Sequence, residues 1–319
     1  MIEFIANYLT FTVIGLDQTS ALSHSVEFFI NDSIKILLLL VIVTYLMSLL
    51  RYYLPIEKIK NFLVSKKLYG FDYFIASFFG AITPFCSCSS IPLFIGFLGA
   101  KIPLGVTLAF LITSPLVNEV ALILLAGIFG WKITIIYAAS GILIGMVGGY
   151  TLDKLRLEKY VQNFIWQTKV PSTTAKADKL PIKKILLIIS REAFVIIKKI
   201  LPYLIIGIAL GALIHGYVPE GYFEKYITKE NIFAVPLAVI IAVPLYSNAS
   251  GVIPIMQALV TKGIPLGTSL AFMMATVGLS LPEALILKKV MKWQLLVAFF
   301  GMVSFGIIIL GYLFNALLP

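Results

Sequence analysis

The chain has 319 residues, of which 60% are hydrophobic and only 13% charged, and its mean hydropathy is +1.01. In soluble domains about a quarter of the residues are charged, so this composition excludes a soluble globular protein and indicates an integral membrane protein. The net charge of +10 does not indicate nucleic-acid binding, because the basic residues lie in loops between apolar stretches. Two cysteines are too few for a disulfide scaffold.

Long apolar stretches predict transmembrane helices, because a helix needs about 20 residues to cross the hydrocarbon core. In chain order they include residues 36–50, 104–127, 133–150, 200–218 and 294–318. We therefore predict an all-α integral membrane protein, folded as a polytopic helical bundle. Its parts are a first transmembrane repeat over 1–152, a cytoplasmic basic linker over 153–183 and a second transmembrane repeat over 184–319.

The two halves of the chain match one another at an offset of about 162 residues. IPLGVTLAF at 102–110 matches IPLGTSLAF at 264–272, and Trp131 matches Trp293. The segment TPFCSCSS at 83–90 falls on VPLYSNAS at 243–250. A near-identity of this length at a constant offset indicates an internal duplication.

The positions of Lys and Arg predict the orientation, because cytoplasmic loops carry an excess of both. Basic residues cluster at 51–67, in the linker 153–183 and at 288–292, so we expect all three in the cytoplasm. The segment 71–99 must then enter the membrane and return, as a re-entrant hairpin or as two short tilted spans. Each half has about three full spans plus one such hairpin, and this odd number makes the repeats inverted. The alternative, eight simple crossings with parallel repeats, conflicts with the charge rule at the linker.

The segment TPFCSCSSIP at 83–92 interrupts an apolar stretch with two prolines and a run of small polar residues. This composition favours a broken helix whose irregular backbone lines a protected cavity. Both cysteines of the chain lie here, and soft sulfur ligands prefer thiophilic ions and metalloids. We predict a substrate site made of Cys86, Ser87, Cys88, Ser89 and Ser90, with Ser247, Asn248 and Ser250 from the second half. The alternative is that these small residues only allow tight helix packing.

Two further motifs place carboxyl groups within apolar stretches. SPLVNEV at 114–120 carries Asn118 and Glu119 after a proline that should kink the span. LSLPEA at 279–284 places Glu283 at nearly the same point of the second half. A carboxyl group inside a membrane usually faces a cavity or a partner, so we predict that these three side chains couple transport to an ion gradient. The alternatives are a structural hydrogen bond for Glu119 and a position near the cytoplasmic interface for Glu283.

The segments TPFCSCSSIPLFIGFLGAKIPLG and TSPLVNEVALILLAGIFGWK resemble the predicted-permease family that includes the organoarsenical efflux permease ArsP. The similarity covers most of the chain and is strongest over 71–150. The resemblance implies a polytopic permease, and the thiol pair of Cys86 and Cys88 matches the signature of the family. No third cysteine occurs, so a three-thiol arsenic site within one protomer is excluded. Methylarsenite has two exchangeable positions and needs only two thiols.

The sequence thus predicts a secondary transporter in the cell membrane, with Cys86 and Cys88 as metalloid ligands. It would export a small thiophilic solute, such as a trivalent organoarsenical, by ion-coupled alternating access. The alternatives are a permease for a sulfur compound or a divalent metal ion, and a membrane thiol-redox enzyme. No nucleotide-binding or hydrolase motif occurs, so we predict no enzymatic activity and no cofactor. The expected partners are the solute and the lipid bilayer, with a homodimer as one option for assembly.

Overall fold

The computed structural model describes residues 2–17, 20–53, 70–83, 87–162, 231, 233–243 and 263–317, with single positions between 187 and 212 and between 252 and 260. Regular structure in these residues is helical, which confirms the predicted all-α class. The β-type pairing found among them is one isolated bridge between Val161 and Met291.

Two of the described helices are long and apolar enough to cross a membrane. They are α8 (Trp131–Lys154) and α15 (Trp293–Leu317). A third span is obtained if the bent pair α6 (Leu104–Leu116) and α7 (Glu119–Phe129) is counted as one. All three correspond to apolar stretches from which the sequence predicts spans.

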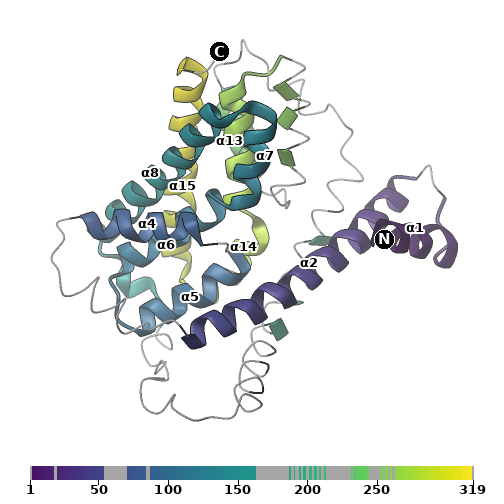
Figure 1. The fold of residues 1–319 in the computed structure, drawn as a ribbon, viewed down its shortest axis with the longest axis horizontal. Coiled ribbons are helices and arrows are strands. Elements are labelled where there is room, and N and C mark those ends of the chain that lie inside the picture. Colours follow the sequence, from purple (N-terminus) through teal and green to yellow (C-terminus); the bar gives the residue numbers. More distant parts are fainter. Residues whose placement is uncertain are drawn as a thin grey trace.

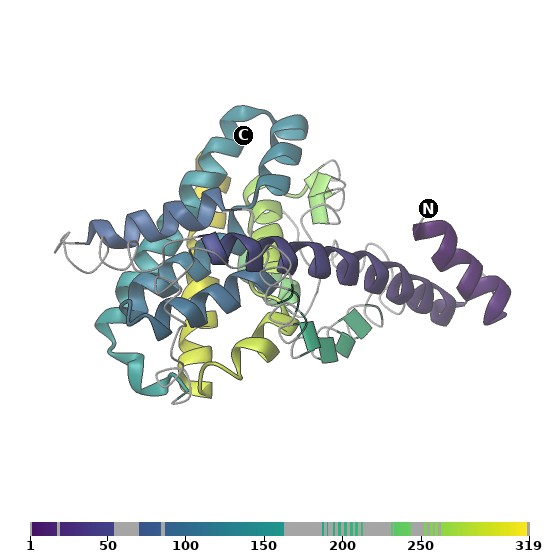
Figure 2. The same ribbon diagram turned by 60° about the horizontal axis from the view of Figure 1, so that its bottom comes forward.

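The N-terminal helices project away from the rest of the body (Figure 1, Figure 2). They are α1 (Ile2–Asn7), the π-helix η1 (Tyr8–Val13) and α2 (Ala21–Tyr53), which contains the predicted span 36–50. α2 contacts the body where it packs against α5 (Ser87–Gly99). The predicted span 200–218 is described only at single helical positions.

The body is built around α6, which packs against α4 (Phe71–Ile82), α5 and α8. A Cβ atom on Gly145 of α8 would overlap the Thr113 hydroxyl of α6, so glycine is required for this close approach. In the second half, α11 (Ala234–Ala242) and α15 pack on α13 (Leu266–Gly278) in a similar arrangement. The remaining elements are the 3₁₀ helix η2 (Leu157–Tyr160) after α8 and α14 (Leu281–Leu287) after α13.

Helices of the two halves correspond at the offset of 162 that relates the sequences. Both α6 and α13 have 13 residues, and each begins at a leucine directly after a proline. Near the end of α8, Asp153 Oδ1 accepts a hydrogen bond of 3.1 Å from the Gly105 amide of α6. Near the end of α15, Asn315 Oδ1 accepts one of 3.0 Å from the Thr268 amide of α13. Equivalent positions therefore bind the first turn of α6 in one half and of α13 in the other. The amide groups of a first turn lack partners within their own helix.

α8 and α15 lie side by side and run in opposite directions. Ile144 of α8 packs against Gly306 of α15, where an added Cβ atom would lie 3.3 Å from Ile144 Cγ2. One turn later on α8, Gly148 faces Met302, which lies one turn earlier on α15. Residue numbers rise along one helix as they fall along the other, so the pair is antiparallel. Ile144 and Gly306 are separated by the same offset, so the crossing brings equivalent positions together.

The chain after α8 pairs with the chain before α15. Val161 and Met291 form the antiparallel bridge. Two backbone hydrogen bonds flank it, from the Lys292 amide to the Tyr160 carbonyl (2.7 Å) and from the Gln162 amide to the Val290 carbonyl (2.9 Å). We call the paired residues 160–162 and 290–292 the clamp, because they fasten one end of α8 to the adjoining end of α15.

Both ends of the segment 71–99 lie at the same end of α8. The Tyr73 hydroxyl, in the first turn of α4, donates a hydrogen bond of 2.8 Å to Asp153 Oδ2. The Gly105 amide, shortly after α5, donates to the other oxygen of the same carboxylate. The chain therefore leaves this end of the body along α4 and comes back to it after α5.

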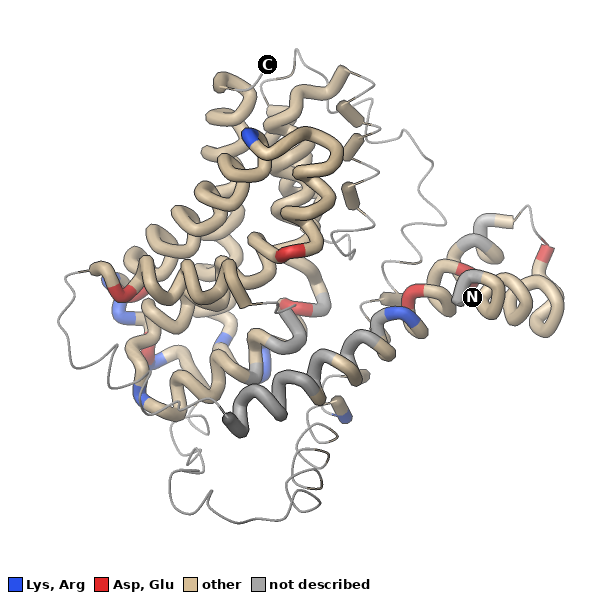
Figure 3. The backbone as a smooth tube through the Cα atoms, in the orientation of Figure 1, with Lys and Arg blue, Asp and Glu red and all other residues tan. Residues whose placement is uncertain are grey.

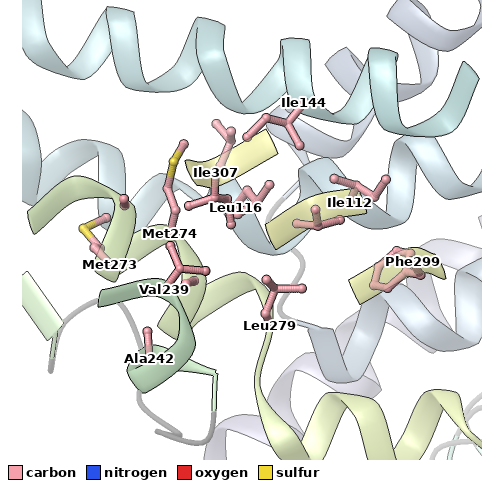
Figure 4. Close-up of a cluster of buried hydrophobic side chains, with 14 of the residues drawn as sticks. Ile112, Leu116, Ile144, Val239, Ala242, Met273, Met274, Leu279, Phe299 and Ile307 are labelled. Carbon is pink, nitrogen blue, oxygen red and sulfur yellow. The ribbon is translucent and has the colours of Figure 1, made fainter. Parts of the chain in front are cut away.

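The largest hydrophobic cluster lies where the two halves meet (Figure 4). It includes Ile112 and Leu116 of α6, Ile144 of α8, Val239 of α11, Leu279 after α13, and Phe299 and Ile307 of α15. Met273 and Met274 of α13 are fully buried in it, as is usual for methionines that fill gaps in a core. Helices from both halves thus share one core.

Most of the described lysines and arginines of the body lie at one end, and Lys132 lies at the other (Figure 3). They include Lys154, Arg156 and Lys159 after α8, and Lys288, Lys289 and Lys292 before α15, all of them exposed. The clamp brings these two groups together. The first turn of α4, which follows the basic segment 51–67, lies at the same end through Tyr73 and Asp153.

Candidate transport site at the helix breaks

Three interruptions between described helices of the body lie at or next to the predicted site residues. α4 ends before Thr83, whose backbone is extended, α6 and α7 are separated at 117–118, and α13 and α14 are separated at 279–280. The first lies within the predicted segment 83–92, but α5 already begins at Ser87 and includes Pro92. Residues 87–90 of the polar run therefore form the first turn of a helix, whereas the sequence predicts a break there, and residues 84–86 lie outside the described residues.

The break between α6 and α7 bends the chain by 45°. The kink predicted from Pro115 is therefore present, and the helix ends at Leu116 directly after the proline, which cannot donate a backbone hydrogen bond. Asn118 starts the next helix, because its Oδ1 accepts a hydrogen bond of 2.8 Å from the Ala121 amide. Asn118 is half-buried, and its side chain acts here as a helix cap.

Tyr137 supports this break from α8. Its side chain is fully buried, and its hydroxyl donates a hydrogen bond of 2.8 Å to the Leu116 carbonyl. That carbonyl ends α6 and would otherwise be among the groups that a helix C-terminus leaves without an intrahelical partner. The equivalent residue of the second half is Phe299, which has no hydroxyl. Sequence reasoning missed Tyr137, because a lone tyrosine in an apolar helix forms no recognisable motif.

The second half repeats the cap at its own break. Ser280 Oγ accepts a hydrogen bond of 3.4 Å from the Glu283 amide at the start of α14. Ser280 and Asn118 occupy equivalent positions. A serine three residues before a glutamate is a signal for a helix start, so Ser280 was within reach of sequence analysis.

The breaks after α6 and α13 meet in the core. A Cβ atom on Gly278 would lie 2.5 Å from Leu116 Cδ2, so these two helix ends are in direct contact. Leu116 and Gly278 are again equivalent positions. The break in the bent pair of α6 and α7 and the break after α13 therefore lie against each other between the halves, and transporters with broken helices bind their substrates at such positions.

The two carboxyl groups differ in environment. Glu283 is only 1% exposed, whereas Glu119, in the first turn of α7, is exposed. They are not equivalent at the offset, since Glu119 corresponds to Leu281. The helix that carries Glu283, α14, packs against α5, which begins in the cysteine segment. The structure thus places the buried carboxyl group of the second half on a helix that contacts the first half.

The predicted thiol site is described only in part. Cys86, Ser247, Asn248 and Ser250 lie outside the described residues, and Ser87, Cys88 and Ser89 are described only as helical backbone in the first turn of α5. Ser90 follows them and is fully buried. Among the residues whose side chains are described, no group of three or more His, Cys, Asp or Glu gathers as a metal site.

Comparison with known proteins decides the family. A family model described as a predicted permease, ArsP_1, matches residues 21–316. The chain belongs to this family. The permease is 24% identical to UPF0718 protein MJ0584 of Methanocaldococcus jannaschii over 319 aligned residues, covering 81% of this chain and 87% of the relative. It is 30% identical to UPF0718 protein YcgR of Bacillus subtilis over 101 residues, 32% of each chain. No solved structure matches the permease.

Family membership and the apolar helices together identify a membrane protein with a general role in transport. The family description supports a transporter rather than an enzyme, and it implies a small-molecule substrate and a lipid bilayer as surroundings. The names of the two relatives specify no substrate.

Proposed function

We propose that this permease is a secondary transporter of the cell membrane that exports a small thiophilic solute, such as a trivalent organoarsenical, by alternating access of two inverted repeats. The observation that carries the proposal is the contact of equivalent residues between antiparallel helices, Ile144 with Gly306. Leu116 with Gly278 is a second contact of this kind. A two-fold axis that relates two antiparallel helices is perpendicular to them, so for membrane spans it lies in the membrane plane. That is the symmetry of inverted repeats.

The hydrogen bonds at Asp153 support a re-entrant hairpin over 71–99. The segment starts and finishes near this carboxylate, so it has no net crossing. The 12 residues of α4 and the 13 residues of α5 are each about 18–20 Å long at 1.5 Å per residue. Either helix is too short for a hydrocarbon core of about 30 Å. Such a hairpin puts the cysteine segment at the turn, inside the membrane.

In this proposal Cys86 and Cys88 bind the metalloid. Methylarsenite carries one methyl and two hydroxyl groups on arsenic. Each thiol forms one sulfur–arsenic bond and gives its proton to a departing hydroxyl group, so two molecules of water leave and no redox partner is needed. The polar contacts would come from Ser87, Ser89, Ser90, Ser247, Asn248 and Ser250. Reversal of the same exchange on the outer side releases the solute.

Coupling to an ion gradient is assigned first to Glu283. It is buried, and its helix contacts the helix of the cysteine segment, so its protonation can influence the proposed binding site. Glu119 is exposed and Asn118 caps α7, so both are weaker candidates in the conformation described. Protonation of Glu283 would favour the state open to one side of the membrane, and proton release would favour the other.

Uptake of methylarsenite into everted membrane vesicles tests the proposal. Vesicles hold the wild type or Cys86→Ser/Cys88→Ser at equal protein amounts, with and without a proton gradient. We expect saturable uptake in the wild type that the double variant loses. Equal uptake by both proteins rules out thiol binding. An absence of uptake in the wild type rules out methylarsenite, and parallel assays with a sulfur compound and a divalent metal ion then test the other substrate classes.

A further inference from the structure

The clamp holds two groups of basic side chains in one place. Three of them lie at or just after the end of α8 and three precede α15, and we call these six residues the basic patch: Lys154, Arg156, Lys159, Lys288, Lys289 and Lys292. The Lys292 ammonium also donates a hydrogen bond of 3.4 Å to the Lys159 carbonyl across the clamp. The two groups are distant in sequence, so their proximity depends on the fold.

Aromatic side chains place the basic patch relative to a bilayer. Trp131 and Tyr150 on α8 are exposed, as are Trp293 and Tyr312 on α15. In each helix the two aromatic residues are 19 positions apart, which is about 28 Å along a helix and close to the thickness of a hydrocarbon core. Exposed Trp and Tyr prefer the two membrane interfaces. Because the helices are antiparallel, Tyr150 and Trp293 lie toward the same end of the pair, the end that carries the basic patch.

The basic patch adjoins these two exposed aromatic residues. Lys154 comes one turn after Tyr150, with its ammonium 5.3 Å from the centre of the Tyr150 ring, and Lys292 directly precedes Trp293. Leu155, between the basic residues, is 62% exposed, so an apolar side chain at this level also faces outward. This combination of cations, exposed aromatic rings and an apolar contact fits the headgroup and upper chain of a phospholipid.

The described acidic residues at this end are fewer than the basic ones. Among the described residues of this end, Glu158 is exposed, while Asp72 and Asp153 are half-buried. Both oxygens of Asp153 accept hydrogen bonds, from Tyr73 and Gly105. At the opposite interface Lys132 adjoins Trp131, and the sequence from Trp293 onward contains no Lys or Arg. Among the described residues of the body, the positive charge is therefore concentrated at one end.

We propose that the basic patch is a binding site for anionic phospholipid, such as phosphatidylglycerol, in the leaflet on that side. The phosphate interacts with lysines from both sides of the clamp, and the acyl chains lie along α8 and α15. Each basic residue near a charged membrane surface contributes attraction of about 1 kcal/mol, which corresponds to about a fivefold preference. The inference depends on the membrane family and the clamp, and it is independent of the transported solute.

Fluorescence quenching of Trp293 by brominated lipids measures this preference at the site. The variant Trp131→Phe/Trp166→Phe keeps Trp293 as the reporter, and it is reconstituted into mixtures of brominated phosphatidylglycerol or brominated phosphatidylcholine with unlabelled lipid. We expect the relative binding constant near Trp293 to favour phosphatidylglycerol by about fivefold or more. In the same background Lys288→Gln/Lys289→Gln/Lys292→Gln should reduce this ratio to near one.

Two control variants separate charge at the patch from other effects. Lys132→Gln removes a positive charge at the opposite interface and should leave the ratio unchanged. Lys288→Arg/Lys289→Arg/Lys292→Arg keeps the charge and should preserve the ratio. Equal quenching of Trp293 by both lipids overturns the proposal. So does a ratio that is unchanged in the triple Lys→Gln variant, or one that is lost in the triple Lys→Arg variant.

Discussion

Ile144 and Gly306 contact each other where α8 crosses α15, and each lies 13 positions after the tryptophan that begins its helix. A contact between equivalent residues occurs only on or near a symmetry axis. One side of the contact is a large β-branched side chain and the other has no side chain, so the two halves fit together through complementary sizes. In the proposed arrangement of inverted repeats, the crossing of α8 and α15 therefore depends on a pair of residues that differ in size.

Replacing Gly306 by leucine tests the crossing. We expect Gly306→Leu to lower the free energy of unfolding by about 1–3 kcal/mol, because the new side chain must displace Ile144. The control is Gly301→Leu on the same helix, where an added Cβ atom meets nothing within 4 Å. Melting temperatures of the purified proteins in detergent make the comparison. Equal melting temperatures for the two variants would show that the crossing is not packed as described.

Tyr137→Phe tests the support of the break after α6. The change leaves the buried Leu116 carbonyl without its hydroxyl donor, which should cost about 1–3 kcal/mol of stability and reduce transport. Tyr150→Phe, at an exposed position of the same helix, is the matched control. Thermal unfolding and vesicle uptake are measured for both. A Tyr137→Phe protein as stable as the control would contradict the role of this hydrogen bond.

Asp153 should be replaceable by asparagine but not by alanine. Asparagine keeps an acceptor for the Gly105 amide, as Asn315 does in the second half, whereas alanine removes the acceptor for Tyr73 as well. We expect Asp153→Ala to cost about 1–2 kcal/mol and Asp153→Asn clearly less. In a double-mutant cycle, Tyr73→Phe should have little further effect once Asp153 is alanine. Independent, additive effects would mean that the two side chains do not interact.

The two glutamates are predicted to respond differently to loss of charge. Glu283→Gln should remove the dependence of uptake on the proton gradient, because glutamine occupies similar space and cannot exchange a proton. Glu119→Gln, at an exposed position, should retain most of that dependence. Uptake of the transported solute with and without the gradient provides the measurement. The opposite pattern would transfer the coupling role to Glu119.

The spans and their interruptions follow from patterns that a sequence displays. The apolar stretches 133–150 and 294–318 lie within a few residues of α8 and α15, because the charge and composition of the chain change sharply at both ends. The kink near Pro115 was predicted because proline cannot continue the backbone bonding of a helix.

Other parts of the site were beyond sequence reasoning. The exposure of Glu119 could not be predicted, since α7 is apolar on all sides apart from its first residues and shows no preferred face. The bond from Tyr137 to Leu116 joins two helices, and nothing in the local pattern of either residue indicates the other. The binding of both chain segments by Asp153 also depends on three-dimensional packing, although the charge distribution correctly indicated that two basic clusters share one end.

The clamp has a consequence for biosynthesis. Val161 is synthesised well before Met291, and at about 5–20 residues per second the delay is on the order of ten seconds. During this time the face of α8 that contains Ile144 has no α15 to cover it, and the linker has no strand to pair with. The interface between the two halves can therefore form only after α15 has entered the membrane.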